Sequence, residues 1–286
     1  MGRQRQRDTP IPQARLDGGG IAEIRPSDFG SGYEVLVDGT PQSHVDLADP
    51  TQLAFEYVAR MGAVIDQLPD GPVTAVHLGA GGLTLPRYIA HTRPGSRQQV
   101  VELEQPLVDL VREHLPLPRE ARIRLRFGDA REGLKRMPPA LAGSVGLLIS
   151  DVYSGAQTPA HLTTVEFYRA AADLLAPDGI LLVNVADGSG LAFARRQAAT
   201  LRAVLPHLAI LAEVQVLKGR RFGNLVLAAS GKPLPTDWLP RLMAAGPHPA
   251  KVAEGREVDT FIGGAIPATD DDASASPKPS MRLFEK

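Results

Sequence analysis

The alternation of strand-like and helix-like segments from Val73 onward constrains the fold of this 286-residue chain more than any other feature. Because strands that alternate with helices form βαβ units, this pattern predicts a mostly parallel sheet with helices on both faces. The short turn KGRRFG joins the last two strands, which indicates an antiparallel final hairpin. We therefore predict an α/β fold with a seven-stranded, mostly parallel sheet. Its seven strand-like runs are VTAVHL, RQQVVEL, IRLRF, VGLLIS, GILLVNV, LAILAEVQV and NLVLAAS.

The chain outside this pattern divides into three parts. Residues 1–20 and 267–286 are polar, with little to bury, and we predict that both are disordered tails. Residues 21–52 hold two short alternating segments and predict a small N-terminal β-hairpin unit. The α/β domain then spans residues 53–266 and resembles the Rossmann-like fold of class I S-adenosylmethionine-dependent enzymes, the methyltransferase-like fold.

Composition excludes several classes of function. With 31 basic and 32 acidic residues the formal net charge is -1, so no general field attracts nucleic acid or an anionic membrane. No apolar run approaches the ~20 residues that a membrane helix needs. The chain has no cysteine and its seven histidines form no ligand-spaced cluster. We expect no metal, no nucleic-acid or membrane partner, and a cytoplasmic location.

A glycine-rich turn follows the first strand of the α/β domain. In VHLGAGGLTL, Gly79 and Gly81 lack side chains, so a ligand can approach the backbone and the N–H groups of the next helix. Glu102 ends the second strand, 23 residues after Gly79, close to the ~20 expected for an acid that binds a ribose diol. These residues predict a nucleoside site; the alternatives are a plain tight turn and a solvent-facing glutamate.

Two aspartates follow later strands. Asp129 and its neighbour Ala130 lie where this fold can bind adenine, although Asp129 is also a good N-cap for the next helix. Asp151 ends the strand VGLLIS, and ligands of parallel sheets bind beyond such strand ends. It is our candidate catalytic residue, with a loop cap as the alternative. Tyr153 and Gln157 lie in the following loop, where they either contact substrate or pack.

Taken together, these motifs resemble the spermidine/spermine synthase (polyamine aminopropyltransferase) family over most of residues 33–230. VDGTPQ is similar to the family's DGxxQ signature, FEY to its aromatic segment, the glycine loop to GGGDGG, VELE to VEID, and GDA to GDG or GDA. The longest match is SDVYSGAQTPAHLTTVEFYRAAADLLAPDGIL, which resembles DSSDPxGPAxxLxxxxFYxxxxxxLxPxGxL.

The resemblance implies an adenosyl thioether or sulfonium ligand, such as decarboxylated S-adenosylmethionine, and a small-molecule amine as the second substrate. It assigns Gln42 to the aliphatic tail of the nucleoside ligand, Glu102 to the ribose and Asp129 to the adenine. Asp151 would take a proton from the attacking amine, and Tyr57 would contact the amine substrate. The resemblance also suggests a homodimer or larger homo-oligomer.

Three positions depart from the family pattern. Gly82 stands where the glycine loop of the family carries Asp, Ser154 replaces the second Asp of DSSD, and Val58 replaces a histidine. The lost acids hold amines in the family, so polyamine recognition is expected to be altered while nucleoside recognition is retained. Two alternatives therefore stay open: a methyltransferase that uses S-adenosylmethionine itself, and a non-catalytic nucleoside-binding homologue.

Overall fold

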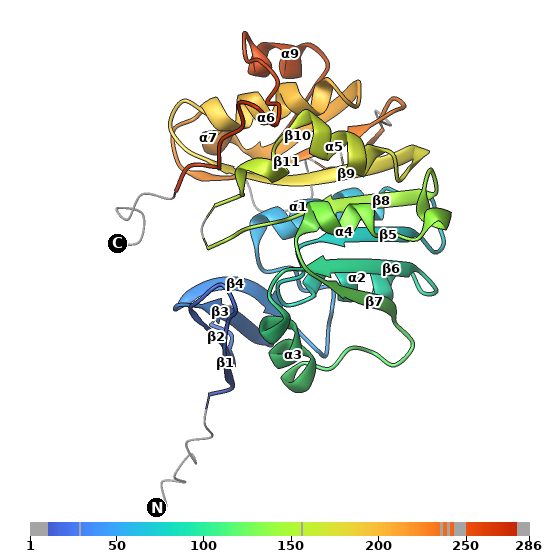
Figure 1. The fold of residues 1–286 in the computed structure, drawn as a ribbon, viewed down its shortest axis with the longest axis vertical. Coiled ribbons are helices and arrows are strands. Elements are labelled where there is room, and N and C mark those ends of the chain that lie inside the picture. Colours follow the sequence, from blue (N-terminus) through green and yellow to red (C-terminus); the bar gives the residue numbers. More distant parts are fainter. Residues whose placement is uncertain are drawn as a thin grey trace, which may run out of the picture.

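The computed structural model describes residues 11–28, 30–155, 157–234, 237–238, 241–242 and 250–278. Its centre is an eight-stranded mixed sheet with the order β12-β10-β11-β9-β8-β5-β6-β7 (Figure 1). Five neighbouring strands, from β7 to β9 in this order, pair in parallel, and β11, β10 and β12 add antiparallel pairs. The predicted α/β fold is confirmed. The strands are β5 (Thr74–Leu78), β6 (Arg97–Glu102), β7 (Arg122–Phe127), β8 (Val145–Ser150), β9 (Leu175–Asp187), β10 (His207–Glu213), β11 (Gly223–Ser230) and β12 (Ala250–Glu254).

The predicted number of seven strands is wrong by one, because β12 was not expected. Its sequence, AKVAE, contributes only Val252 and Ala253 as buried residues, which is too short an apolar run to read as a strand. The antiparallel hairpin of β10 and β11 is present as predicted, and β12 pairs with the other side of β10.

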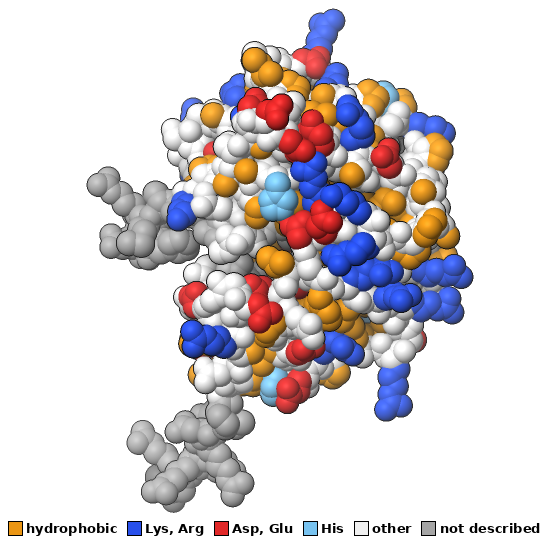
Figure 2. All heavy atoms as spheres, in the orientation of Figure 1, with side chains coloured by type: hydrophobic (Ala, Val, Ile, Leu, Met, Phe, Trp, Pro, Cys, Tyr) orange, Lys and Arg blue, Asp and Glu red, His pale blue; other side chains and the backbone are white. Residues whose placement is uncertain are grey.

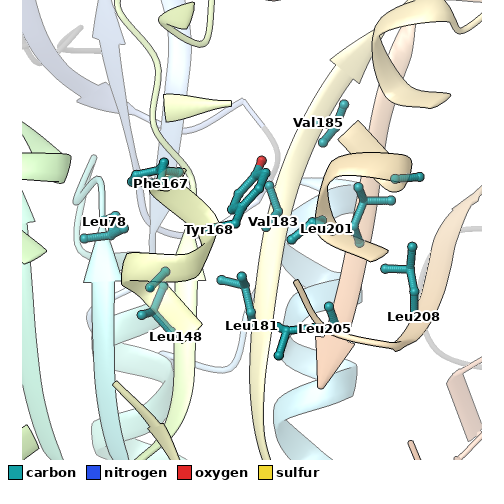
Figure 3. Packing of buried hydrophobic residues seen from close by; sticks show 14 of the residues in the cluster. Leu78, Leu148, Phe167, Tyr168, Leu181, Val183, Val185, Leu201, Leu205 and Leu208 are labelled. Atoms are coloured by element: carbon teal, nitrogen blue, oxygen red, sulfur yellow. The ribbon is translucent and has the colours of Figure 1, made fainter. Parts of the chain in front are cut away.

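Helices cover both faces of the main sheet and create a core on each face. In β8, Leu147 and Ile149 belong to one core and Leu148 to the other, since successive strand residues point to opposite faces. Figure 3 shows Leu148 and Tyr168 in the second core. No described helix is both long and apolar enough to cross a bilayer. The helices are α1 (Glu56–Asp66), α2 (Thr84–Thr92), α3 (Gln105–His114), α4 (Ala130–Lys135), α5 (Val165–Ala172), α6 (Ala192–Arg202), α7 (Val214–Leu217) and α9 (Arg256–Ile262), with 3₁₀ turns η1 (Pro139–Leu141) and η2 (Ala160–Leu162).

The N-terminal unit is an antiparallel sheet of four strands rather than a hairpin. Its strands are β1 (Gln13–Arg15), β2 (Ile21–Pro26), β3 (Tyr33–Val37) and β4 (Thr40–Val45). It lies beside α3 in Figure 1, and its apolar face joins a third core with α3 and β6. Because β1 pairs with β2, the predicted tail 1–20 is wrong from residue 13 onward, and the part at residues 1–10 lies outside the described residues.

The predicted tail at 267–286 is also wrong for its described part, residues 267–278. Ala268 and Ser276 are buried, and the amide of Ser276 donates to the carbonyl of Thr158 at 3.1 Å. Arg131 forms an ion pair with Asp270 at 2.6 Å. The segment is held by hydrogen bonds and ion pairs instead of an apolar face, so its composition alone resembles that of a disordered chain. Residues 279–286 lie outside the described part.

Candidate functional site

A cavity of about 890 Å³ lies at the carboxyl ends of β5, β6, β7 and β8, against the N-terminal sheet. Nine of the ten predicted site residues line it: Gln42, Tyr57, Gly79, Gly81, Glu102, Asp129, Ala130, Asp151 and Tyr153. The exception is Gln157. Its amide donates to the carbonyl of Ser276, so it holds the C-terminal segment instead of facing the cavity.

Acidic side chains dominate the charge of the cavity lining. Five carboxylates line it, and none of the lining residues is Lys or Arg. Three histidines, His44, His77 and His161, also line it. Burial lowers the pKa of His77 to about 4, so this imidazole is neutral near pH 7, and His161 lies 2.7 Å from Asp129. In Figure 2, Lys and Arg side chains gather at one side of the molecule, where β7 with its exposed Arg122 and Arg124 forms the edge of the sheet. The cavity is therefore suited to a cationic ligand. The five acids are Asp38, Glu102, Glu104, Asp129 and Asp151.

The glycine loop begins where β5 ends at Leu78, and its geometry requires glycine. Gly79 has φ +87°, and a Cβ on it would lie 2.1 Å from the carbonyl oxygen of Asp151. Gly81 has φ +49°, and a Cβ there would lie 2.5 Å from the hydroxyl of Ser43 in β4. Only glycine allows the loop to pass this close to both neighbours.

Glu102 is held in place by the backbone around it. One carboxylate oxygen accepts from the N–H of Ala80 at 2.7 Å, and the other accepts from Leu103 at 2.8 Å and Glu104 at 3.0 Å. These bonds fix the carboxylate at the mouth of the glycine loop. A carboxylate in this position can accept hydrogen bonds from two adjacent hydroxyl groups.

Asp129 is an N-cap, as the alternative from the sequence had it. It accepts from the N–H groups of Arg131 at 2.9 Å and Glu132 at 3.1 Å at the start of α4. His161 lies 2.7 Å from its second oxygen. Burial would raise the pKa of Asp129, but these hydrogen bonds outweigh it and lower the pKa below the ordinary 3.8. The carboxylate is therefore charged, and its role toward adenine stays a prediction.

Asp151 follows β8 and carries hydrogen bonds on both oxygens. Oδ1 accepts from the amide of Asn184 at 2.8 Å, and Oδ2 accepts from the hydroxyl of Tyr57 at 3.1 Å. Burial raises the pKa of Asp151 above the ordinary 3.8, and the charge of Glu102 adds to this, while the two hydrogen bonds oppose it. A carboxylate with a raised pKa and fixed geometry has the properties of a general base.

Two tyrosines flank Asp151. Burial, followed by the negative charge of Asp151, raises the pKa of both Tyr57 and Tyr153, so both hydroxyls are protonated at neutral pH. The hydroxyl of Tyr153 is buried and makes no hydrogen bond of normal geometry to any described residue. Thr158, Asn224 and the backbone of Ala186 are the polar neighbours of this hydroxyl.

The N-terminal sheet leaves no room for an acidic side chain at residue 82, where the glycine loop of the family carries Asp. The N–H of Gly82 donates to the Ser43 hydroxyl at 2.8 Å, and a Cβ on Gly82 would lie 2.9 Å from the Cβ of Ser43. An aspartate at residue 82 would need β4 to move. At the other replaced position, Ser154 lines the cavity and is exposed.

Sequence reasoning missed two parts of the site. The first is the β1–β2 turn: Leu16 and Gly18 to Gly20 line the cavity, and Glu104 accepts from the N–H groups of Asp17 at 2.8 Å and Gly18 at 2.9 Å. The glycine run in LDGGG was the available signal. The second is Asn184, an amide inside the apolar run GILLVNV, which is 4% exposed and contacts Asp151.

The solved structure of a probable spermidine synthase from Corynebacterium glutamicum is similar to this chain throughout. The two are 33% identical, the match covers 92% of this chain and 97% of the other, and the TM-score is 0.81. This chain belongs to the spermidine/spermine synthase family. The family assignment indicated by the sequence motifs is thus confirmed, although no protein-family model matches the chain.

Curated relatives of this family member are more distant. A polyamine aminopropyltransferase of Vibrio vulnificus is 28% identical over 40% of this chain, and one of Neisseria meningitidis serogroup A is 27% identical over 61%. These matches span 38% and 66% of the relatives' own length. The human methyltransferase-like protein 13, 18% identical with a TM-score of 0.52 over 76% of this chain and 96% of the other, shares the fold.

Proposed function

We propose that this family member transfers an aminopropyl group from decarboxylated S-adenosylmethionine, or a related adenosyl sulfonium, to a small-molecule amine. The observation that carries the proposal is the state of Asp151: a half-buried carboxylate of raised pKa, held by Tyr57 and Asn184 in a cavity with no Lys or Arg in its lining. An amine nucleophile and a sulfonium donor are both cations that such a cavity attracts.

The nucleoside half of the donor would bind at the glycine loop. Gly79 and Gly81 allow close approach to the backbone, and Glu102, Asp129 and Ala130 line the same cavity. Glu102 would accept hydrogen bonds from the ribose, and Asp129 with Ala130 would contact the adenine. Gln42 lies on the N-terminal sheet side, where it would contact the aliphatic tail. These residues account for binding and orientation; they take no part in proton transfer.

Asp151 would perform the chemical step with Tyr57 and Tyr153 beside it. It binds the ammonium of the acceptor and takes one proton, which frees the nitrogen lone pair. The nitrogen then forms a bond to the aminopropyl carbon next to sulfur while the carbon–sulfur bond breaks. The electron pair of that bond returns to sulfur and leaves the neutral thioether methylthioadenosine, so the remaining task of the protein is in-line positioning.

The charge of the cavity favours this reading over a methyltransferase that uses S-adenosylmethionine. The intact donor carries a methionine carboxylate, which would lie in a cavity lined by five acids and by no Lys or Arg. Loss of that carboxylate removes the repulsion. For a non-catalytic homologue, the raised pKa of Asp151 would be a cost without a purpose.

Ligand-induced thermal stabilisation tests the donor. We expect decarboxylated S-adenosylmethionine and methylthioadenosine to raise the Tm, because ligands bound only to the native state stabilise it, and S-adenosylmethionine to raise it much less. The opposite order of the two donors would favour the methyltransferase. Absence of a shift with all three ligands would contradict the nucleoside site itself.

A further inference from the structure

A chain of hydrogen bonds reaches Asp151 from the protein interior. Asn184 in β9 donates its amide to Oδ1 of Asp151 at 2.8 Å, and Asn224 in β11 donates its own amide to Oδ1 of Asn184 at 2.9 Å. The chain crosses β8, β9 and β11, which are neighbours in the sheet. Neither asparagine lines the cavity, so neither is placed to touch a ligand.

The hydrogen bond from Asn224 to Asn184 influences which end of the Asn184 amide faces Asp151. An asparagine amide presents either its oxygen or its N–H₂ group, and only the N–H₂ group stabilises a carboxylate. Asn184 is 4% exposed, so water competes little for its amide. Because the amide of Asn224 donates to the oxygen of Asn184, this bond favours the orientation in which the N–H₂ end of Asn184 faces Asp151.

The other groups around Asp151 cannot supply the same stabilisation. Glu102 at the end of β6 and burial both favour the protonated form of Asp151. Tyr57 from α1 donates to the other oxygen, at the longer distance of 3.1 Å. Tyr153, from the same loop as Asp151, is a near neighbour, but no hydrogen bond joins their side chains; its hydroxyl lies beside Asn224, so a substitution of Asn224 also changes the surroundings of Tyr153. The charge state of Asp151 therefore depends on the donor from Asn184.

We propose that Asn224 is a positioning residue, which fixes the amide orientation of Asn184 and thereby keeps Asp151 ionised and able to accept a proton. The inference rests on the proposed function in that Asp151 is the general base there. The effect itself, in which Asn224 acts on the carboxylate of Asp151 through the amide of Asn184, requires no substrate.

The test is the pH profile of kcat/KM with decarboxylated S-adenosylmethionine and an amine. Asn224→Leu keeps the size of the side chain and removes the donor, so the acid limb should move up by about one pH unit, with roughly tenfold lower activity below it. Asn224→Asp, which faces the oxygen of Asn184 with a carboxylate, should move the limb further. The acceptor amine titrates in the same way with every variant, so a difference between their pH profiles comes from the protein.

The matched control is Gln197→Leu. Gln197 is a buried amide on α6 that bonds to Tyr168 and to the carbonyl of Thr163. Its loss should lower the Tm and leave the acid limb in place. If the acid limb of the pH profile shifts equally in Gln197→Leu and Asn224→Leu, the role of Asn224 is structural only, and the proposal is wrong. If Asn224→Leu does not fold, Asn224→Ala removes the same donor.

A second readout separates this inference from the proposed function. The pKa of Asp151 can be followed by ¹³C NMR of its carboxyl carbon, assigned by its absence in Asp151→Asn. A higher pKa of Asp151 in Asn224→Leu supports the positioning role even in a protein that turns over no amine. An unchanged pKa overturns it, whether or not amine transfer is observed.

Discussion

At Asp151 the stability of the fold and the proposed function make opposite demands. Its side chain is half-buried, and this burial raises its pKa above 3.8. A group with a raised folded-state pKa stabilises the fold most when protonated, below its unfolded pKa, and this stability is lost as the pH rises through the folded value. At neutral pH the ionised Asp151 is therefore a cost to the fold that a catalytic role would explain.

Replacement of Asp151 by Asn should relieve this cost. The Asn oxygen can still accept from Asn184, and its N–H₂ can donate to the Tyr57 hydroxyl. We expect Asp151→Asn to raise the free energy of unfolding at pH 7 by about 0.5–2 kcal/mol. The gain should shrink as the pH falls toward 3.8, where the wild-type side chain also becomes neutral. Urea unfolding at several pH values measures both effects.

Asp46→Asn is the control with the opposite sign. Hydrogen bonds from Ser31 and from the backbone of Asp49 and Ala48 lower the pKa of Asp46 below 3.8, so its ionised form stabilises the fold. Its replacement should destabilise the protein at pH 7, and the loss should fade at low pH as the wild-type stability disappears. Destabilisation by Asp151→Asn at pH 7 would contradict the picture of a strained carboxylate.

The ends of β5 and β8 come close together where Gly79 contacts the backbone of Asp151. A side chain there meets two obstacles: a positive φ of +87° and the backbone carbonyl of Asp151 at 2.1 Å from the Cβ position. Gly71 has φ +105° with nothing within 4 Å of its Cβ position, so it meets only the first. Substitutions at these two glycines therefore distinguish the cost of backbone strain from the cost of a steric clash.

We expect Gly71→Ala to lower the free energy of unfolding by about 1–2 kcal/mol, the cost of the left-handed backbone. Gly79→Ala should cost about 2 kcal/mol more, because a backbone carbonyl cannot rotate away as a flexible side chain can. It should also weaken methylthioadenosine binding, which Gly71→Ala should not. Chemical denaturation and calorimetric titration of the two variants check this; equal losses would mean that the strand ends separate freely.

The sequence predicted elements that bury apolar runs and missed those held by polar contacts. The helix and strand periodicity located β5 to β11, and Asp151 and Glu102 followed from their place at strand ends. β1, β12 and residues 267–278 were missed because each buries few apolar residues. Asn184 was missed for a related reason: its function lies in a contact across two strands, which no local pattern encodes.

Across the whole molecule, charge is distributed unevenly. The net charge of -1 conceals a separation between Arg side chains at the β7 edge and a cavity lined by five carboxylates. Gly82 and Ser154 stand where the family pattern has acids, and Asp151 is the remaining acid of its loop in the cavity lining, which under the proposed function would attract a cation. Under the proposed function, the acceptor amine would have one strong contact, with Asp151.

The most direct test is mass-spectrometric product analysis with decarboxylated S-adenosylmethionine and a panel of amines that includes putrescine and spermidine. The account predicts equal amounts of methylthioadenosine and an amine enlarged by one aminopropyl group, with at least ~100-fold less product from Asp151→Asn, since general bases contribute on that order. A methylated product formed from S-adenosylmethionine, or undiminished turnover by Asp151→Asn, would contradict it.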